Sequence, residues 1–170
     1  MKKTLLTLML TIVSAIVLNA QSLTGKQWFT KLTSEDDMEI VIGLTFEKNG
    51  TCELVMATEY EMKDDDVPID FAGSVTVPGT YTLSGNDLKM NLLKRKAEAE
   101  LGYDIKGMDA RTKALLDKEI EADIKALKKE FKNDMLDGMP TLHNVKIVSL
   151  DSHRLIIKDD DGDEIPFYAE

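Results

Sequence analysis

The strongest constraint on the fold is an alternation of apolar and polar residues that recurs along most of the chain. Apolar side chains occupy every second position from Met38 to Phe46, and the alternation resumes from Cys52 to Met62. A period of two is typical of β-strands that bury one face. An Asn-Gly pair at residues 49–50 separates the two runs, and because both residue types tolerate positive φ, it predicts a tight hairpin. We therefore expect two long antiparallel strands here.

Shorter runs with the same period follow. Charged residues and a proline at 63–68 predict a loop, and Pro78 with Gly79 predicts a turn. Further turns are predicted at 84–87 and at the Asp-Gly pair of residues 161–162. The fold class is therefore mostly β. About nine short antiparallel strands are expected, at 25–32, 38–46, 52–62, 71–77, 80–83, 88–92, 145–150, 155–157 and 165–168.

A helical insertion is expected at about 94–138. From Asp109 to Asp137 the apolar period becomes that of a helix whose other faces are charged. Asp109 is a suitable N-cap, and Gly138 is a suitable stop. The helix would be roughly 40 Å long, longer than a small barrel is tall, so part of it must overhang. Its apolar stripe consists of Leu116, Ile120, Ile124, Leu127, Phe131 and Met135.

This stripe has two interpretations, and so does the segment that precedes the helix. We expect the stripe to pack against the outside of the barrel, because a long exposed apolar surface would be a liability. Pairing with the same helix of a second chain is the alternative. Residues 94–108 fit either a helix, which we prefer, or continued strand alternation from Ala97 to Ile105.

Residues 1–20 have the form of a secretory signal peptide. Two lysines precede an apolar run from Leu5 to Leu18, which is shorter than the ~20 residues of a membrane span. Ala20 offers a small residue at the cleavage point. We expect export to the periplasm or the exterior, with an uncleaved membrane anchor as the alternative. A lipid anchor would need cysteine in place of Gln21, so we do not expect one.

Residues 21–170 are expected to form one domain, the usual arrangement at this length. Loss of the two signal-peptide lysines from the 21 basic residues leaves 19 against 31 acidic ones, a net charge of −12. That charge disfavours nucleic acid and anionic membranes as partners. The single cysteine, Cys52, excludes an internal disulfide, and its position in phase with Leu54 and Met56 indicates a small buried side chain.

The residues available for chemistry do not form a catalytic pattern. Only His143 and His153 could act as bases near neutral pH, and neither has a nucleophile and an orienting group in a recognisable arrangement. We therefore do not expect an enzyme or a cofactor. The acidic run near the C-terminus lacks the glycine and glutamate spacing of a calcium loop, so it offers only weak calcium candidates: Asp159, Asp161 and Asp163.

Several segments resemble the lipocalin-like domains of exported bacterial proteins, which are calycin-type β-barrels. They are Leu23 to Trp28, Leu44 to Thr51, Gly79 to Leu88, and the closing stretch 145–162. Two residues separate Gly25 from Trp28, where the lipocalin signature has one, and lipocalins usually carry their helix after the barrel. The resemblance implies an antiparallel up-and-down barrel of about eight or nine strands with Trp28 packed across one end.

These patterns together favour an exported, non-catalytic binding module for a small molecule or a protein. A small hydrophobic ligand would be held in the barrel. One alternative is a protein-interaction or inhibitor protein that acts through its surface and has a filled barrel; a carboxylate-dependent hydrolase is the other. Because the strands are short, we favour a filled interior over a hollow one. The partner is thus a small hydrophobic molecule or another protein. A ligand in the interior would be lined by Trp28, Met38, Ile40, Phe46, Met56, Tyr60, Tyr81 and Met90.

Overall fold

The computed structural model describes residues 23–33, 38–64, 67–105, 107 and 109–169 of the 170-residue chain. The predicted signal peptide at 1–20 lies outside the described residues. The strands are β1 (Gln27–Thr33), β2 (Glu39–Phe46), β3 (Thr51–Asp64), β4 (Val67–Ser84), β5 (Asp87–Leu92), β6 (Glu98–Ile105), β7 (Asn144–Leu150), β8 (Arg154–Lys158) and β9 (Glu164–Ala169). A single 3-10 turn, η1 (Lys94–Lys96), and one long helix, α2 (Ala110–Asp137), complete the described elements. The mostly β prediction is confirmed.

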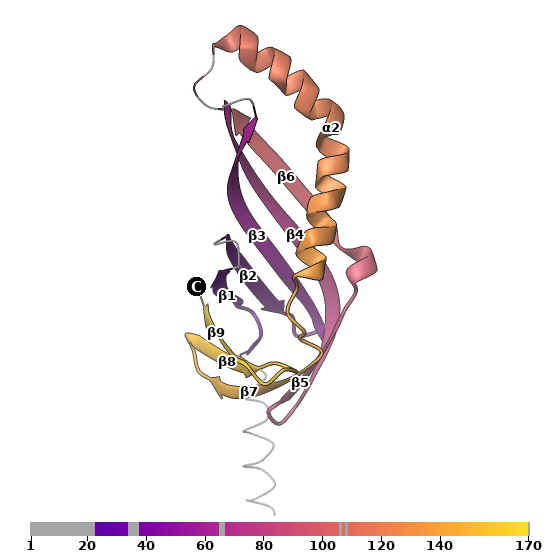
Figure 1. Cartoon of the computed structure of the whole chain (residues 1–170). Coiled ribbons are helices and arrows are strands. Elements are labelled where there is room, and N and C mark those ends of the chain that lie inside the picture. Colours follow the sequence, from indigo (N-terminus) through magenta and orange to yellow (C-terminus); the bar gives the residue numbers. More distant parts are fainter. Residues whose placement is uncertain (1–22, 34–37, 65–66, 106, 108, 170) are drawn as a thin grey trace, which may run out of the picture.

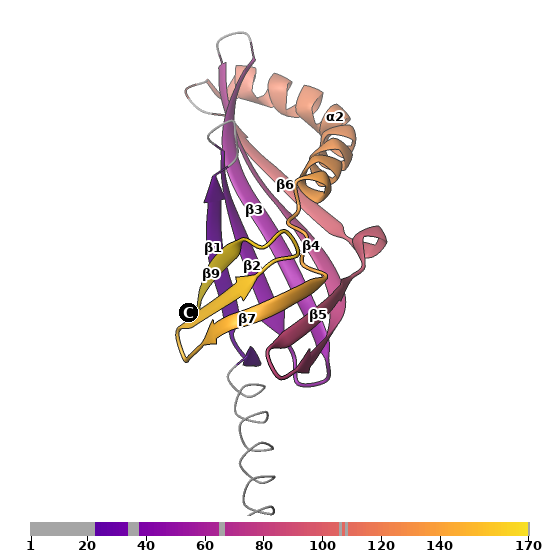
Figure 2. The ribbon, with the colours of Figure 1, turned by 60° about the horizontal axis from the view of Figure 1, so that its bottom comes forward.

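Eight of the described strands close into an antiparallel barrel (Figures 1 and 2). Within the run β1–β5, and within the run β7–β9, each strand pairs with the one that follows it. Strand β5 then pairs with β7, and β9 pairs with β1 to close the barrel. The barrel is therefore up-and-down, as expected. Its seams are unequal, because β1 meets β9 over two residue pairs and β3 meets β4 over fourteen.

Strands β3 and β4 continue beyond the barrel wall. Strand β2 leaves β3 after the pair Ile40–Thr58, whereas β3 and β4 stay paired as far as Asp64 and Val67. Strand β6 pairs with β4 over residues 69–76, on the edge that β5 occupies further along β4. The upper part of β3 (59–64), the first part of β4 (67–76) and β6 form a three-stranded sheet, which we call the extension (Figure 1).

The lower end of α2 closes the top of the barrel. Phe131 and Met135 are buried and belong to the main core cluster, which also contains the side chains of the barrel interior. Phe131 lies against Gly73 of β4. The helix therefore packs on the inner face and not against the outside of the barrel, so that expectation is wrong.

The upper part of α2 lies over the inner face of the extension. Leu116 and Ile120 pack against a small apolar cluster from β4 and β6, formed by Ile69, Phe71 and Ile105. Lys113 Nζ lies 3.0 Å from Asp104 Oδ1 of β6, and the Tyr103 hydroxyl donates to the carbonyl oxygen of Asp117. At 1.5 Å per residue the 28-residue helix is about 42 Å long, and the extension accounts for the overhang expected from the sequence.

The ends of α2 follow the expected capping pattern. Asp109 Oδ1 accepts the backbone N–H groups of Arg111 and Thr112, and the Thr112 hydroxyl donates to Asp109 Oδ2. At the other end, the N–H of Gly138 donates to the carbonyl of Asp134. The predicted helix bounds are confirmed.

The preference for helix between residues 94 and 108 is wrong for most of that segment. Only η1 is helical, and Glu98–Ile105 is the strand β6. Its side chains alternate as the second interpretation required, with Ala97, Ala99 and Ile105 buried. Pairing with the long edge of β4 outweighs the helix propensity of the Ala, Glu and Lys residues in this stretch.

Two predicted breaks lie within strands. Pro78 and Gly79 do not form a turn, because β4 runs through them without interruption to Ser84. The predicted loop at 63–68 is also shorter than expected, since β3 ends at Asp64 and β4 begins at Val67. The turns at 49–50, 84–87 and 161–162 are confirmed, with glycines at positive φ at positions 50, 85 and 162.

Candidate functional site

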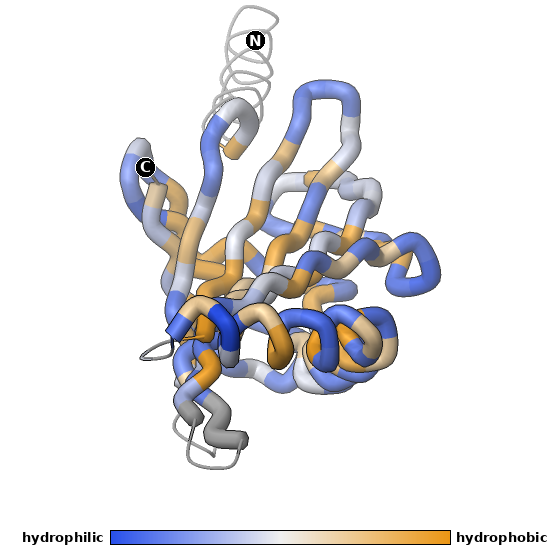
Figure 3. Tube along the Cα trace, turned by 90° about the horizontal axis from the view of Figure 1, so that it is seen from above, coloured by the Kyte–Doolittle hydropathy of each residue, from blue (hydrophilic) through white to orange (hydrophobic). Residues whose placement is uncertain are grey.

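The inner face of the barrel is occupied by its own side chains. Trp28, Phe46, Met56 and Met90 are at most 2% exposed and belong to one continuous core cluster. Figure 3 shows hydrophobic and hydrophilic residues alternating along the strands, as one buried face requires. Half of the predicted ligand-lining residues are therefore core residues in contact with one another.

Trp28 fixes the start of the barrel. Its Nε1 donates to the carbonyl oxygen of Leu23 at 2.9 Å, so the indole N–H is satisfied although the side chain is fully buried. Lys26 Nζ lies 5.5 Å from the centre of the indole ring and donates to the carbonyl of Ser152 in the β7–β8 connection. These contacts tie the segment before β1 to the β7–β8 connection.

The other four predicted lining residues do not gather around one space. Tyr81 is half-buried beside the 49–50 turn, where its ring meets Phe46 edge-on at 5.1 Å. Tyr60 stacks on Phe71 in the extension at 5.3 Å. Phe46 pairs with Cys52 of β3, and Tyr60 lies eight positions further along the same strand. The Tyr81–Phe46 pair and the Tyr60–Phe71 pair are therefore roughly 26 Å apart. Ile40 is the second residue of β2 and Met38 immediately precedes that strand, and both are half-buried.

The outer face of the extension is hollowed. One hollow of about 870 Å³ runs across β2, β3, β4 and β6. A second of about 550 Å³ continues it toward the end of β3 and the start of β4. The two share Glu59, Ala72 and Gly102. We call the continuous surface the outer trough. Its outward-facing lining residues are Glu39, Val41, Ala57, Glu59, Glu61, Asp70, Ala72, Ser74, Glu100, Gly102 and Asp104.

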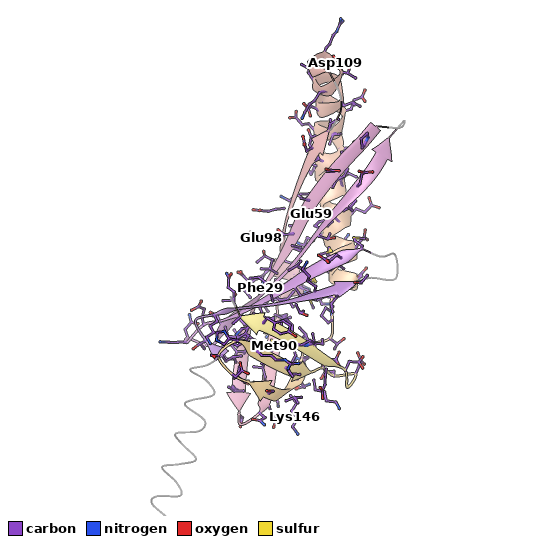
Figure 4. All side chains as sticks on the ribbon, turned by 90° about the vertical axis from the view of Figure 1, so that its left-hand side faces the viewer. Phe29, Glu59, Met90, Glu98, Asp109 and Lys146 are labelled. Atoms are coloured by element: carbon purple, nitrogen blue, oxygen red, sulfur yellow. The ribbon has the colours of Figure 1, made fainter. Side chains whose placement is uncertain are left out.

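Strand register explains the shape of the trough. Ala72 of β4 lies between Glu59 of β3 and Gly102 of β6, and Ser74 lies between Ala57 and Glu100. The middle strand thus presents the small side chains of Ala72 and Ser74, with the carboxylate of Asp70 further along it, while carboxylates also stand on the strands to either side. Figure 4 shows Glu59 and Glu98 on strands of the extension, with α2 behind that sheet. The helix therefore covers the inner face and leaves the trough open.

Among the side chains that the structure describes, those lining the two hollows include carboxylates and no basic residue, so the described lining is negatively charged. Two of its carboxylates are paired, Glu39 with Lys31 at 2.6 Å and Asp104 with Lys113 at 3.0 Å. The side chains that the structure describes provide no ion pair to Glu59, Glu61 or Glu100. These three carboxylates are therefore available to pair with a basic group of a ligand.

The residues considered for catalysis are dispersed. His143 and His153 lie at opposite ends of the seven-residue strand β7, roughly 23 Å apart, and His143 Nδ1 lies 2.9 Å from the carbonyl oxygen of Met90. Cys52 is 5% exposed, and burial raises the pKa of its thiol to about 11. The buried-hydrophobe interpretation of Cys52 is confirmed.

The acidic turn near the C-terminus uses its carboxylates locally. Asp159 Oδ1 accepts the backbone N–H groups of Asp161, Gly162 and Asp163, which closes the β8–β9 hairpin. The Asp160 carboxylate accepts the N–H groups of His143 and Asn144. Across the described ranges, no group of three or more acidic, histidine or cysteine side chains is arranged to hold a metal ion.

The sequence does contain a signal for the trough, but the alternation hides it. Its residues are the polar half of the same period-two pattern that identified the core, and by themselves they indicate only a solvated face.

No protein-family model matches the chain, and no curated protein matches it significantly. In the part of the chain that is described, no helix is long and apolar enough to cross a membrane.

Proposed function

We propose that this chain is an exported, non-catalytic, lipocalin-like binding module that acts through its outer trough while its own side chains fill the barrel. It corresponds to the surface-acting alternative drawn from the sequence. The observation that carries the proposal is the contrast between the two faces of one sheet. The inner face is packed to 0–2% exposure at its largest side chains, whereas the outer face has a hollow of about 870 Å³.

The packing of the barrel argues against a ligand in its interior. A small eight-stranded barrel has room for side chains or for one small ligand, but not for both. Here Trp28 is fully buried, and it belongs to the same core cluster as Phe131 and Met135 of α2. A hydrophobic molecule would have to displace several of these core side chains.

In-cell photo-crosslinking tests the proposed face. A photoreactive phenylalanine analogue at Ala72, an exposed floor residue of the trough, is expected to give discrete crosslinked species when the exported chain is irradiated in cells. The matched control is the same analogue at Val148, which is 48% exposed on β7, away from the trough. Crosslinks from position 72 and not from position 148 are the expected result.

Two outcomes would contradict the proposal. Equal crosslinking from both positions, or none from position 72, would remove the trough as the binding face. A stoichiometric apolar small molecule in organic extracts of the purified protein, detected by mass spectrometry, would favour the interior-ligand function instead.

A further inference from the structure

We propose that the outer trough holds an extended polypeptide segment rich in lysine or arginine, lying along β4 between the carboxylates of β3 and β6. This inference rests on the proposed function and names the chemistry of the partner. It is carried by the dimensions of the unpartnered sheet face and by the sign of the charge on its two sides.

The dimensions fit one extended chain. Strands β3 and β6 both neighbour β4, so their outward side chains stand about 9.6 Å apart across the trough. The floor between Glu59 and Glu100 is Ala72 and Ser74 of β4, with Gly102 of β6 beside Ala72, and beyond Ala72 the same strand carries the carboxylate of Asp70. Small side chains allow a backbone to approach the sheet closely, so one strand-like segment fits between the two carboxylate rows.

The spacing of the carboxylates fits the side-chain period of such a segment. Glu59 and Glu61 are two residues apart on β3, which places them about 6.6 Å apart on the outer face. The side chains of an extended chain repeat at the same interval on each of its sides. A segment along β4 can therefore direct basic side chains toward Glu59 and Glu61 on one side and toward Glu100 on the other.

Charge complementarity selects this occupant over others. The described lining of the trough consists of acidic, small and apolar residues, and the whole chain carries a net charge of −10. A second copy of this chain, an anionic membrane and a nucleic acid would all be repelled. A helix is about 10–12 Å across with its side chains, wider than the about 9.6 Å between the outward side chains of β3 and β6, so it would not reach the floor.

The test is binding of a fluorescein-labelled octalysine peptide to the purified full chain, followed by fluorescence anisotropy. Lysine repeats repel one another and keep the peptide extended. We expect saturable binding that weakens when salt rises from about 0.05 M to about 0.3 M. Replacing one carboxylate on each wall, in the double variant Glu59→Gln with Glu100→Gln, should weaken binding about tenfold, because two opposite-charge pairs are lost.

Two further variants separate the trough from net charge. Glu119→Gln with Glu121→Gln removes the same number of exposed carboxylates from α2 and should leave binding unchanged. Ala72→Phe keeps every carboxylate but fills the floor, and it should abolish binding without lowering the melting temperature, since Ala72 is exposed on the outer face. Melting temperatures of all variants check that the fold is retained.

Several results would overturn the inference. Full binding by the Glu59 and Glu100 variant or by Ala72→Phe would place the peptide elsewhere, and equal losses in the α2 control would reduce the effect to net charge. Displacement of the peptide by equimolar spermine would show that any polycation suffices. Crosslinking from position 72 to a partner in cells without octalysine binding would leave the proposed function standing and reject a basic segment as its partner.

Discussion

The ring of Phe131 on α2 occupies the space into which a side chain at Gly73 on β4 would project. A Cβ atom at position 73 would lie 2.5 Å from Phe131 Cζ and 2.8 Å from Cε1. The aromatic ring can therefore reach the backbone of the sheet at the top of the barrel. This contact joins the helix to the main core and closes the interior from above.

Gly73→Ala is expected to destabilise the protein by roughly 1–3 kcal/mol, because the methyl group must push Phe131 out of its position. Gly102→Ala is the matched control on β6, where the nearest heavy atom to a new Cβ is 3.9 Å away, so its cost should be small. Urea denaturation followed by circular dichroism measures both changes. In a Phe131→Ala background the penalty at position 73 should largely vanish, and an unchanged penalty would refute the contact.

Cys52 is expected to react with thiol reagents only when the protein unfolds. Burial raises the pKa of its thiol from the ordinary value of 9.0 to about 11, so at pH 8 the thiolate fraction falls about 100-fold, and access is restricted as well. The measurement is the rate of iodoacetamide labelling with and without denaturant. Labelling of the folded chain at the rate of a free cysteine would contradict the buried position.

The same pKa shift predicts a loss of stability in alkali. Because the thiol of the unfolded chain deprotonates at lower pH than the buried one, this group leaves stability unchanged below about pH 9 and lowers it as pH rises from 9 toward 11. Cys52→Ala should remove this part of the pH dependence. Identical alkaline profiles for the two proteins would show that the thiol is not shielded.

The N-cap of α2 gives a prediction at acidic pH. Hydrogen bonds from the Thr112 hydroxyl, then from the N–H groups of Thr112 and Arg111, lower the pKa of Asp109 below its ordinary 3.8. Its contribution is therefore fully present above pH 3.8 and is lost as pH falls through the lowered pKa. Asp109→Ala should reduce the melting temperature at pH 7, and Asp109→Asn should reduce it less because the amide oxygen still caps.

Acidification provides the control for that prediction. The difference in melting temperature between the original chain and Asp109→Ala should shrink when the pH is lowered below 3.8. A constant difference at all pH values would show that the carboxylate charge plays no part in the cap.

The barrel was what the lipocalin resemblance implied. The period-two alternation was sufficient to predict most of the strands, because burial of one face is the main requirement on an antiparallel strand. It predicted the strands around the 49–50 turn and the Trp28 segment, and the helix period predicted α2 with its cap at Asp109. Local patterns of this kind report which face is buried. They do not report how long two paired strands remain together.

The errors arose where tertiary pairing overrides local signals. Pro78 interrupts no ladder, because it lies where β4 changes partner between β6, last paired at Thr76, and β5, first paired at Gly79. Pro68 similarly lies just before the first β6 pair at Ile69. At neither position does β4 have to donate a backbone N–H to β5 or β6, so proline is tolerated in the strand.

The candidate site was beyond sequence reasoning for a related reason. Glu59, Ala72 and Gly102 are distant in the chain and become neighbours only through the β3–β4 and β4–β6 registers. The β6 assignment was itself the uncertain part of the sequence. Without it, the outer residues of β3 and β4 have no opposite wall, and no trough can be inferred.

The central claim is that the barrel interior is filled, so that binding falls to the outer face. Methyl NMR of methionine-labelled protein during titration with decanoate tests it most directly, since Met56 and Met90 are at most 2% exposed inside the barrel. The account predicts that both methyl signals stay in place throughout the titration. Saturable shifts of the Met56 and Met90 methyl groups would show that an apolar molecule enters the barrel and would contradict the account.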